Sequence, residues 1–297
     1  MTDGAGRSAA AESGTMLQMS PTDPPPQRSR TLVVSFLGSV VRRMGNWMPI
    51  AGTVELMAEL GIDAASARTA VFRLKGRGWL DSQTRDAARG YELTPLALKT
   101  LAAGDEVIWH ARQPADLADG WCVINFSVPE SARAKRHQLR AHLAHLGFGN
   151  ISTALWIAPA RMQAAAEEAI AELDLTRYAV LFVGDYAGPQ NLTDLLRQGW
   201  DLPAIDQRYR DFIVRYGDVA AGLEAQATIG LPESFATYLA VVDHWRNLPF
   251  RDPGLPRELL LDDWSAPEAV ALFERLVALL EGRALAHAAS CWPRHAA

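Results

Sequence analysis

The chain has 297 residues, of which 49% are hydrophobic and 21% charged, a composition typical of a globular protein large enough for two or three domains. No stretch approaches the ~18 consecutive apolar residues that a membrane helix needs. Residues 1–27 lack the basic start and apolar core of a secretory signal, so we expect a cytoplasmic protein. The two cysteines, Cys122 and Cys291, lie far apart, which excludes a disulfide framework and a cysteine-rich zinc site.

The net charge of −5 is unevenly distributed along the chain. Residues 28–100 carry 11 Lys and Arg against 6 Asp and Glu, a net charge of +5, whereas residues 101–297 carry a net charge of −8. Attraction to phosphates depends on local rather than net charge. The pattern is therefore compatible with a nucleic-acid-binding domain in the first part of the chain.

The first 43 residues divide into a tail and a helix. Residues 1–29 are rich in Gly, Ala, Ser and Pro and show no apolar period, which predicts a disordered tail. The apolar residues from position 32 to position 41 then follow a helical spacing. Arg42 and Arg43 place two cations at the end of this segment, which is typical of the C-terminal turn of a helix.

Two further helices separated by a tight turn are expected next. The first is predicted over residues 51–60. Asp63 can accept hydrogen bonds from backbone N–H groups at the start of the second, which is predicted over residues 64–77. The apolar spacing of this second helix predicts one packed face and one cationic face. Its polar and cationic side chains are Ser66, Arg68, Thr69, Arg73, Lys75 and Arg77.

A β-hairpin is expected after this helix. Its first strand begins at Trp79, its polar tip covers residues 82–89 with Arg85 and Arg89, and Gly90 is expected to turn the chain into the returning strand. The order helix, helix, turn, helix, hairpin is that of a winged helix. We therefore predict a winged-helix DNA-binding domain over residues 30–110.

The remainder of the chain is predicted to form two further domains. Over residues 111–190, strand-like runs alternate with amphipathic helices, which indicates a small ferredoxin-like α+β domain. Over residues 191–297 the apolar spacing is helical again. The predicted fold class is thus α+β and multidomain, with an N-terminal winged helix-turn-helix, a central ferredoxin-like domain and a mostly helical C-terminal domain.

The cations of the predicted winged helix suit nucleic-acid recognition. A guanidinium group pairs with phosphate oxygens or with the O6/N7 edge of guanine. We therefore expect Arg73 and Arg77, together with Thr69 on the same face of the helix, to contact bases in the major groove. Ser66 and Arg68 lie on the same helix. The phosphate contacts are expected from the remaining cations: Arg42, Arg43, Lys75, Arg85 and Arg89. The alternative is that these cations only solvate an amphipathic helix, and that the winged helix is an adaptor that binds proteins.

Other patterns give little support for catalysis or metal binding. His142 and His145 lie one helical turn apart, but no third metal ligand is indicated nearby. Cys122 is expected to fill an apolar strand. A nuclease on a ferredoxin-like unit needs a carboxylate at the end of its first strand, where Asn125 and Ser127 stand. We therefore predict neither catalytic residues nor a metal site.

Residues 68–74 (RTAVFRL), followed by Gly78, Trp79 and Leu80, resemble the PaaX-type family of transcriptional repressors of phenylacetic acid degradation. The likeness continues upstream through residues 32–38 and downstream in the C-terminal region, at residues 209–212, 244–246 and 252–260 and at Trp264. It therefore covers about residues 30 to 280. A long Pro-rich tail and a sparsely basic wing depart from the family pattern.

The resemblance implies a three-part protein whose central domain is similar to that of the CRISPR spacer-acquisition nucleases. It implies a homodimer on double-stranded operator DNA that is released by an aryl-CoA thioester, typically phenylacetyl-CoA. It also assigns Arg68, Thr69 and Arg73 to the recognition helix, and it leaves the effector-binding residues unknown.

The residues that would bind an effector are not ranked by the sequence. An aromatic series could line a ligand pocket or could be ordinary packing: Trp156, Trp200, Tyr209, Phe212, Tyr216 and Trp245. A CoA ligand also needs cations for its phosphates, and the C-terminal region offers Arg208, Arg210, Arg215, Arg246, Arg251 and Arg257. The sequence thus predicts a ligand-responsive repressor; the alternatives are a non-DNA adaptor and, with less support, a nuclease or thioester hydrolase.

Overall fold

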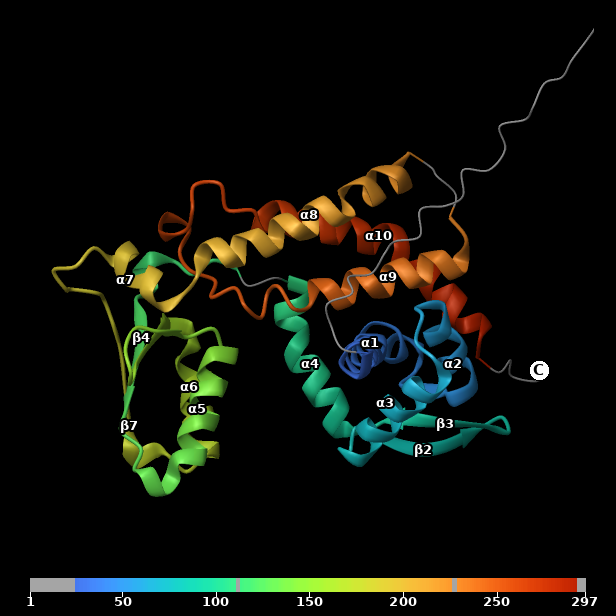
Figure 1. Cartoon of the computed structure of the whole chain (residues 1–297), viewed down its shortest axis with the longest axis horizontal. Helices are drawn as coiled ribbons and strands as arrows, with labels where there is room; N and C mark the ends of the chain where they lie inside the picture. Colours follow the sequence, from blue (N-terminus) through green and yellow to red (C-terminus); the bar gives the residue numbers. More distant parts are fainter. Residues whose placement is uncertain (1–24, 111–112, 226–228, 293–297) are drawn as a thin grey trace, which may run out of the picture.

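The computed structural model describes residues 25–110, 113–225 and 229–292 (Figure 1). Within these ranges the chain forms a three-stranded and a four-stranded antiparallel sheet, and its last third is mostly helical. The predicted α+β class with a helical C-terminal part is confirmed. No helix in the described ranges is long and apolar enough to span a membrane.

Helix α1 (Pro25–Ser39) lies at the centre of the N-terminal part, with α3 and α9 packed on it (Figure 1). The predicted tail therefore ends earlier than expected: residues 1–24 lie outside the described residues, and residues 25–29 are helical. Proline is tolerated in the first helical turn because its missing N–H has no helical partner there. The predicted helix also ends early, and a short 3-10 helix, η1 (Val41–Met44), follows.

The next two helices lie close to their predicted positions. Strand β1 (Trp47–Pro49) leads into α2 (Ile50–Glu59), and α3 (Ala64–Gly76) follows a tight turn. Asp63 caps α3 as predicted, because its carboxylate accepts a hydrogen bond from the backbone N–H of Ser66 at 2.9 Å. The buried face of α3 packs on α1 and α2 and consists of Ala67, Ala70, Val71 and Leu74.

The hairpin turns at a different place from the prediction. Strand β2 (Leu80–Arg85) pairs with β3 (Ala88–Leu93), so the turn residues are Asp86 and Ala87, with φ of 49° and 62°. Two left-handed residues match the twist of the flanking strands. Gly90 is not a turn but a strand residue of β3, and a Cβ there would lie 2.4 Å from the carbonyl oxygen of Met48 on β1.

The central part has its own sheet and its own core. Helix α4 (Pro95–His110) and η2 (Leu117–Asp119) lead into a sheet of order β5-β6-β4-β7. Helices α5 and α6 cover one face of this sheet (Figure 1), and Cys122, Ile124, Leu139 and Leu143 lie buried between them. The elements after η2 are β4 (Trp121–Phe126), η3 (Glu130–Ala132), α5 (Arg133–His145), β5 (Gly149–Asn150), β6 (Leu155–Pro159), η4 (Ala160–Met162), α6 (Gln163–Glu172), η5 (Thr176–Tyr178) and β7 (Ala179–Gly184).

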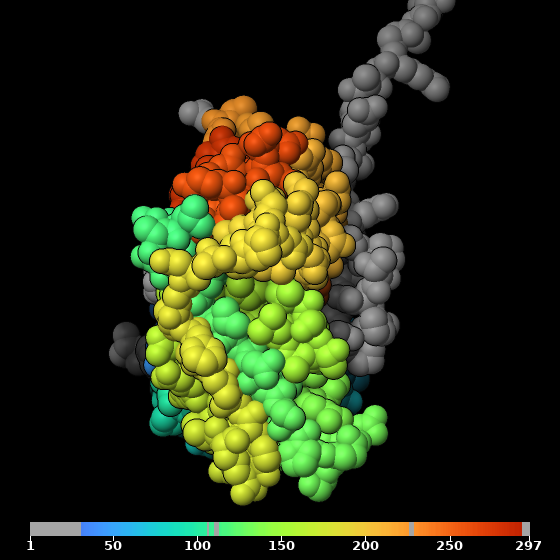
Figure 2. All heavy atoms as spheres, turned by 90° about the vertical axis from the view of Figure 1, so that its left-hand side faces the viewer, coloured from blue at the N-terminus to red at the C-terminus, as the bar shows by residue number. Residues whose placement is uncertain are grey.

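The C-terminal helices share a core with the N-terminal part. The elements are α7 (Leu192–Gly199), α8 (Leu202–Glu224), α9 (Leu231–Trp245), η6 (Arg257–Leu259) and α10 (Ala266–Ser290). Phe235 of α9 packs edge-on against Phe36 of α1, with ring centroids 6.2 Å apart. Figure 2 shows the central part beneath the C-terminal helices. Buried side chains of α1, α3, α9 and α10 belong to one continuous hydrophobic cluster. Because such a core is closely packed, a shift of α9 or α10 also moves the side chains of α1 and α3.

Candidate nucleic-acid interface

The outward face of α3 is cationic, as the sequence predicts. Arg68, Thr69, Arg73 and Arg77 are exposed there and have no ion-pair or hydrogen-bond partner for their side chains among the described residues. Arg77 is the C-cap residue of α3. Guanidinium groups that are exposed and unpaired remain available to bind an anionic partner.

Phe72 lies on the same face and was missed by the sequence analysis. Its side chain is 71% exposed although it is large and apolar. The signal was present, because position 72 lies one helical turn after positions 68 and 69, on the outward side of a helix whose inward side is defined by Val71 and Leu74. An exposed phenyl ring among cations suits apolar contact with the methyl group of thymine in a major groove.

Two other predicted residues of α3 are bound within the domain. The Ser66 hydroxyl donates to the Asp63 carboxylate at 2.6 Å, which completes the helix cap. The Lys75 ammonium donates to the Ser82 hydroxyl at 2.7 Å and so ties α3 to β2. The first contact stabilises the start of α3, the second fixes α3 against the hairpin, and the Lys75 side chain remains exposed.

The hairpin cations differ in their surroundings. Arg85 pairs with Glu92 at 2.7 Å and lies over the ring of Trp47, 5.5 Å from its centroid. Arg89 is exposed, and no partner for its side chain lies among the described residues. Arg89 is therefore the better placed of the two to contact a phosphate, and Arg85 holds the hairpin on β1.

Arg42 and Arg43 have carboxylate partners in other elements. Arg42 makes a bidentate pair with Asp105 of α4 at 2.8 and 2.6 Å, and its side chain is only 19% exposed. Arg43 pairs with Glu281 of α10 at 3.2 Å. The structure does not bring these two guanidinium groups onto the α3 face, because each joins η1 to a later helix.

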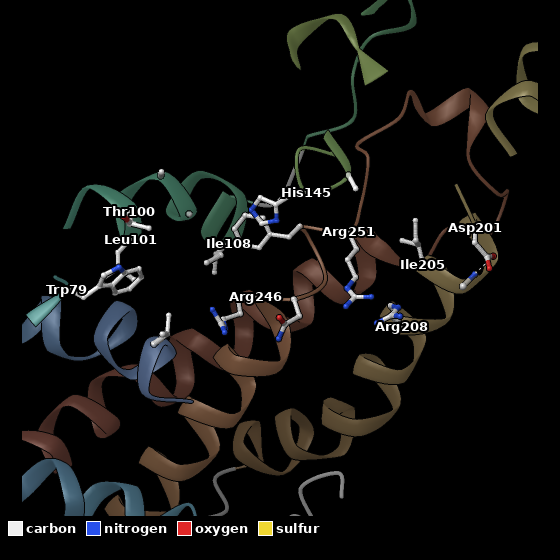
Figure 3. Close-up of a pocket in the computed structure, with 17 residues that line it drawn as sticks. Trp79, Thr100, Leu101, Ile108, His145, Asp201, Ile205, Arg208, Arg246 and Arg251 are labelled. Atoms are coloured by element: carbon white, nitrogen blue, oxygen red, sulfur yellow. Dashed lines mark hydrogen bonds between the residues drawn. The ribbon is translucent and has the colours of Figure 1, made fainter. Parts of the chain in front are cut away.

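A large cleft lies next to α4, at the junction of the N-terminal, central and C-terminal parts. Its volume is about 990 Å³. Trp79 and Leu101 lie toward one end, and Arg208 and Arg251 toward the other, with Arg246 between them (Figure 3). Burial and the nearby charge of Arg208 lower the pKa of Arg251.

The structure distinguishes the C-terminal arginines that face the cleft from those that do not, which the sequence could not do. Arg208, Arg246 and Arg251 line the cleft, and of these Arg246 pairs with Asp243 at 3.2 Å. The others are engaged elsewhere. Arg210 binds Asp206 and Asp263, Arg215 lies over the ring of Tyr216, and Arg257 donates to the carbonyls of Leu261 and Asp262.

Most members of the aromatic series that the sequence offered as a pocket lining are packed in the core instead. Phe212 contacts Tyr216 and Trp245, with ring centroids 4.8 and 5.3 Å apart, and all three side chains are at most 1% exposed. Trp156 and Trp200 are also buried. Tyr209 donates to Asp252 at 2.9 Å and borders a second, smaller cavity of about 350 Å³.

Three segments of the chain match protein-family models. They are "PaaX-like protein" over residues 28–96, "PaaX protein central Cas2-like domain" over residues 114–196, and "PaaX-like protein C-terminal domain" over residues 200–290. The chain belongs to the PaaX family. The first match contains α3 and the hairpin, and the second contains the four-stranded sheet.

Two individual proteins resemble this PaaX family member. The Transcriptional repressor PaaX of Escherichia coli (strain K12) is 24% identical over 248 residues, which cover 82% of this chain and 78% of that protein. The solved structure of the uncharacterized protein Rv0674 from Mycobacterium tuberculosis has a TM-score of 0.56 at 22% identity, covering 87% of this chain and 98% of that chain. The latter likeness concerns the fold alone.

Residues whose side chains could serve catalysis have other contacts or environments in this PaaX family member. Glu130, the acid nearest to the end of β4, pairs with Arg136 at 2.9 Å and with Arg133 at 3.6 Å. Burial raises the pKa of the Cys122 thiol to about 11, so the nucleophilic thiolate is scarce at neutral pH. His145 stacks on Phe250. Within the described residues, no group of three or more His, Cys, Asp or Glu is placed to hold a metal ion.

Proposed function

We propose that this chain is a DNA-binding transcriptional repressor of an aromatic-acid catabolic operon of the phenylacetate type. The observation that carries the proposal is the α3 face, where exposed and unpaired Arg68, Thr69, Arg73 and Arg77 stand on a rigidly capped helix. The E. coli relative is named a transcriptional repressor, and the match to it covers most of both chains. In keeping with that regulator, the chain is not an enzyme.

In this proposal the N-terminal part, residues 30–110, is a winged helix-turn-helix. Helices α2 and α3 form the helix-turn-helix, and the β2–β3 hairpin is the wing. The central part, residues 111–190, is ferredoxin-like, which agrees with its antiparallel sheet covered on one face by two helices. Residues 191–297 form the helical C-terminal domain.

The contacts to DNA divide by chemistry. Thr69, Arg73 and Arg77 face base edges in the major groove, with Phe72 against a thymine methyl group. Arg68 and the wing residue Arg89 bind phosphates, which makes binding strongly salt-dependent. Ser66, Lys75 and Arg85 hold the domain in shape, and Arg42 and Arg43 are left out because other elements already pair with them.

A homodimer is part of the proposal, and β7 offers a surface for the second copy. β7 lies at the edge of the four-stranded sheet and has the uncharged sequence AVLFVG. Val180 and Phe182 are 52% and 67% exposed on it. Edge strands are normally protected by charges or proline, so this strand is suited to a partner strand. Antiparallel pairing of β7 with its own copy satisfies two-fold symmetry with one surface.

The proposed effector is an aryl-CoA thioester, with phenylacetyl-CoA as the first candidate, and the proposed location is the cytoplasm. Effector binding shifts the dimer toward a spacing of its two α3 helices that no longer fits two half-sites about one DNA turn apart. No cofactor or metal enters this proposal.

A gel shift on the promoter region of the chain's own gene, near physiological salt with excess nonspecific DNA, tests the proposal. We expect a specific complex that phenylacetyl-CoA dissolves. Arg73→Ala is expected to weaken the complex by about 1–3 kcal/mol, and Arg133→Ala on α5 is the matched control. Weak, sequence-indifferent binding by the wild type would favour the protein-adaptor function instead.

A further inference from the structure

The cleft at the junction of the three parts has an apolar end and a cationic end. Trp79, which precedes β2, and Leu101 of α4 lie toward the apolar end, and Arg208 of α8 and Arg251 lie toward the other, where Asp201 also lines the cleft (Figure 3). Neither of these arginines has a carboxylate partner among the described residues. Two guanidinium groups that face one cleft and form no ion pair with a described carboxylate are complementary to a ligand with several negative charges.

The electrostatics of the cationic end agree with this arrangement. Burial, and then the nearby positive charge of Arg208, lower the pKa of Arg251, so the charged guanidinium of Arg251 lacks compensation in the cleft. A bound phosphate would relieve this repulsion. By contrast, Arg246 already pairs with Asp243, so it is less available to a ligand.

We infer that this cleft binds a ligand that carries phosphates at Arg208 and Arg251 and an apolar group against Leu101 and Ile108. Aryl-CoA thioesters belong to this chemical class, so the inference rests on the proposed function and assigns its effector site. The volume of about 990 Å³ lies at the upper end of ordinary ligand sites, as a CoA-sized ligand requires.

The same cleft is joined to the DNA-facing helix by a short chain of hydrogen bonds. Thr94, just before α4, accepts from the backbone N–H of Ala97 at 3.2 Å and donates its hydroxyl to the carbonyl of Gly78 at 2.6 Å. Its own N–H donates to the carbonyl of Trp79 at 3.1 Å. Gly78 follows Arg77, the C-cap of α3. A ligand that displaces α4 therefore also displaces the end of α3.

Direct binding without DNA tests the site. Phenylacetyl-CoA, CoA and phenylacetate are titrated calorimetrically into the full chain, and we expect phenylacetyl-CoA to bind tightest and phenylacetate weakest. Arg208→Ala/Arg251→Ala is expected to weaken phenylacetyl-CoA binding at least tenfold, while Arg197→Ala on α7 leaves it unchanged. The inference is overturned if the double variant binds as the wild type does, if phenylacetate binds tightest, or if none of the three binds.

A variant that fills the cleft provides an independent check. Ala204 lines the cleft from α8 and is exposed, so Ala204→Trp is expected to block phenylacetyl-CoA without removing a cation. Unaltered binding of phenylacetyl-CoA to this variant would place the ligand outside the cleft.

Operator binding by the same proteins separates this inference from the proposed function. The Arg208→Ala/Arg251→Ala variant is expected to bind operator DNA as the wild type does but to resist release by phenylacetyl-CoA. Thr94→Val is expected to bind phenylacetyl-CoA within about twofold of the wild type. Its release from operator DNA is expected to need more phenylacetyl-CoA. Release at the wild-type concentration would overturn the route through α4. If the wild type binds the thioester through the two arginines but no operator, the site stands and the proposed function fails.

Discussion

The indole Nε1 of Trp245 donates to the carbonyl oxygen of Ile108 at 2.7 Å. This hydrogen bond joins the end of α9 to the last turn of α4, the helix between the hairpin and the central sheet. Trp245 is fully buried and stacks on Phe273, with ring centroids 4.6 Å apart. Ile108 lines the large cleft. The bond therefore fixes one wall of the cleft to the C-terminal core.

Trp245→Phe is expected to lower the free energy of unfolding by about 2–3 kcal/mol, because it removes the hydrogen bond to the Ile108 carbonyl and part of a packed ring. Urea unfolding followed by circular dichroism measures the loss. Trp156→Phe is the matched control, since the Trp156 indole N–H is buried and has no partner among the described residues. We expect a smaller loss there; equal losses would show that the hydrogen bond contributes little.

Phe72→Ala and Arg89→Ala are expected to weaken operator binding in different ways. Phe72 carries no charge, so its loss should reduce discrimination between operator and random DNA and leave the salt dependence unchanged. Arg89→Ala should weaken binding to both DNAs and reduce the slope of log K against log salt by about 1. Fluorescence anisotropy over a salt series measures both quantities. A lower slope for Phe72→Ala would contradict the apolar role.

Phe182→Lys is expected to convert the proposed dimer to a monomer, because a charge on β7 cannot be buried against a second copy without a partner. Sedimentation velocity at micromolar concentration measures the change. Val214→Lys is the control, since Val214 is 81% exposed on α8, away from β7. A dimer that survives Phe182→Lys would place the interface elsewhere.

Ala87→Gly is expected to stabilise the chain by about 0.5–1 kcal/mol, since Ala87 has a φ of 62°, a conformation that costs a residue with a Cβ more than it costs glycine. Ala88→Gly, in the adjacent strand position, should destabilise by a similar amount because glycine only adds chain entropy there. Thermal unfolding of both variants gives the comparison. A gain from both changes would contradict the assigned turn.

His244 is expected to make stability pH-dependent between about pH 4 and 6.5. Burial and the charge of Arg215 lower its pKa from 6.5 to about 4, against a smaller opposite effect of Asp211. The unfolded chain therefore binds a proton that the folded chain does not, and stability falls as the pH drops through this range, by roughly 3 kcal/mol in total. Urea unfolding at pH 7 and pH 5 should show this fall in the wild type.

The comparison of two variants isolates that effect. His244→Leu should flatten the pH dependence over this range, whereas His137→Leu, at an exposed position on α5, should leave it as in the wild type. The same slope in His244→Leu and the wild type would assign the dependence to other groups.

The DNA-facing helix could be derived from the sequence because its determinants are local. The spacing of Ala67, Val71 and Leu74 sets the buried face of α3, and Asp63 is placed to cap it. The turn of the hairpin could not be placed from the sequence. Glycine is common in turns, but Gly90 is a strand residue whose missing Cβ allows the close approach of β1, which lies more than 40 positions earlier. The real turn, at Asp86 and Ala87, has no glycine to mark it.

By itself, the sequence determined the α+β class, the helical C-terminal part, the two faces of α3 and the resemblance to the PaaX family. Only the tertiary structure decided which cations remain available: Arg42 pairs with Asp105 across 63 positions, while Arg208 and Arg251 come together at the cleft. The physical reason is that helix faces follow from the 3.6-residue period of a continuous segment, whereas ion pairs and clefts depend on contacts between elements far apart in the chain.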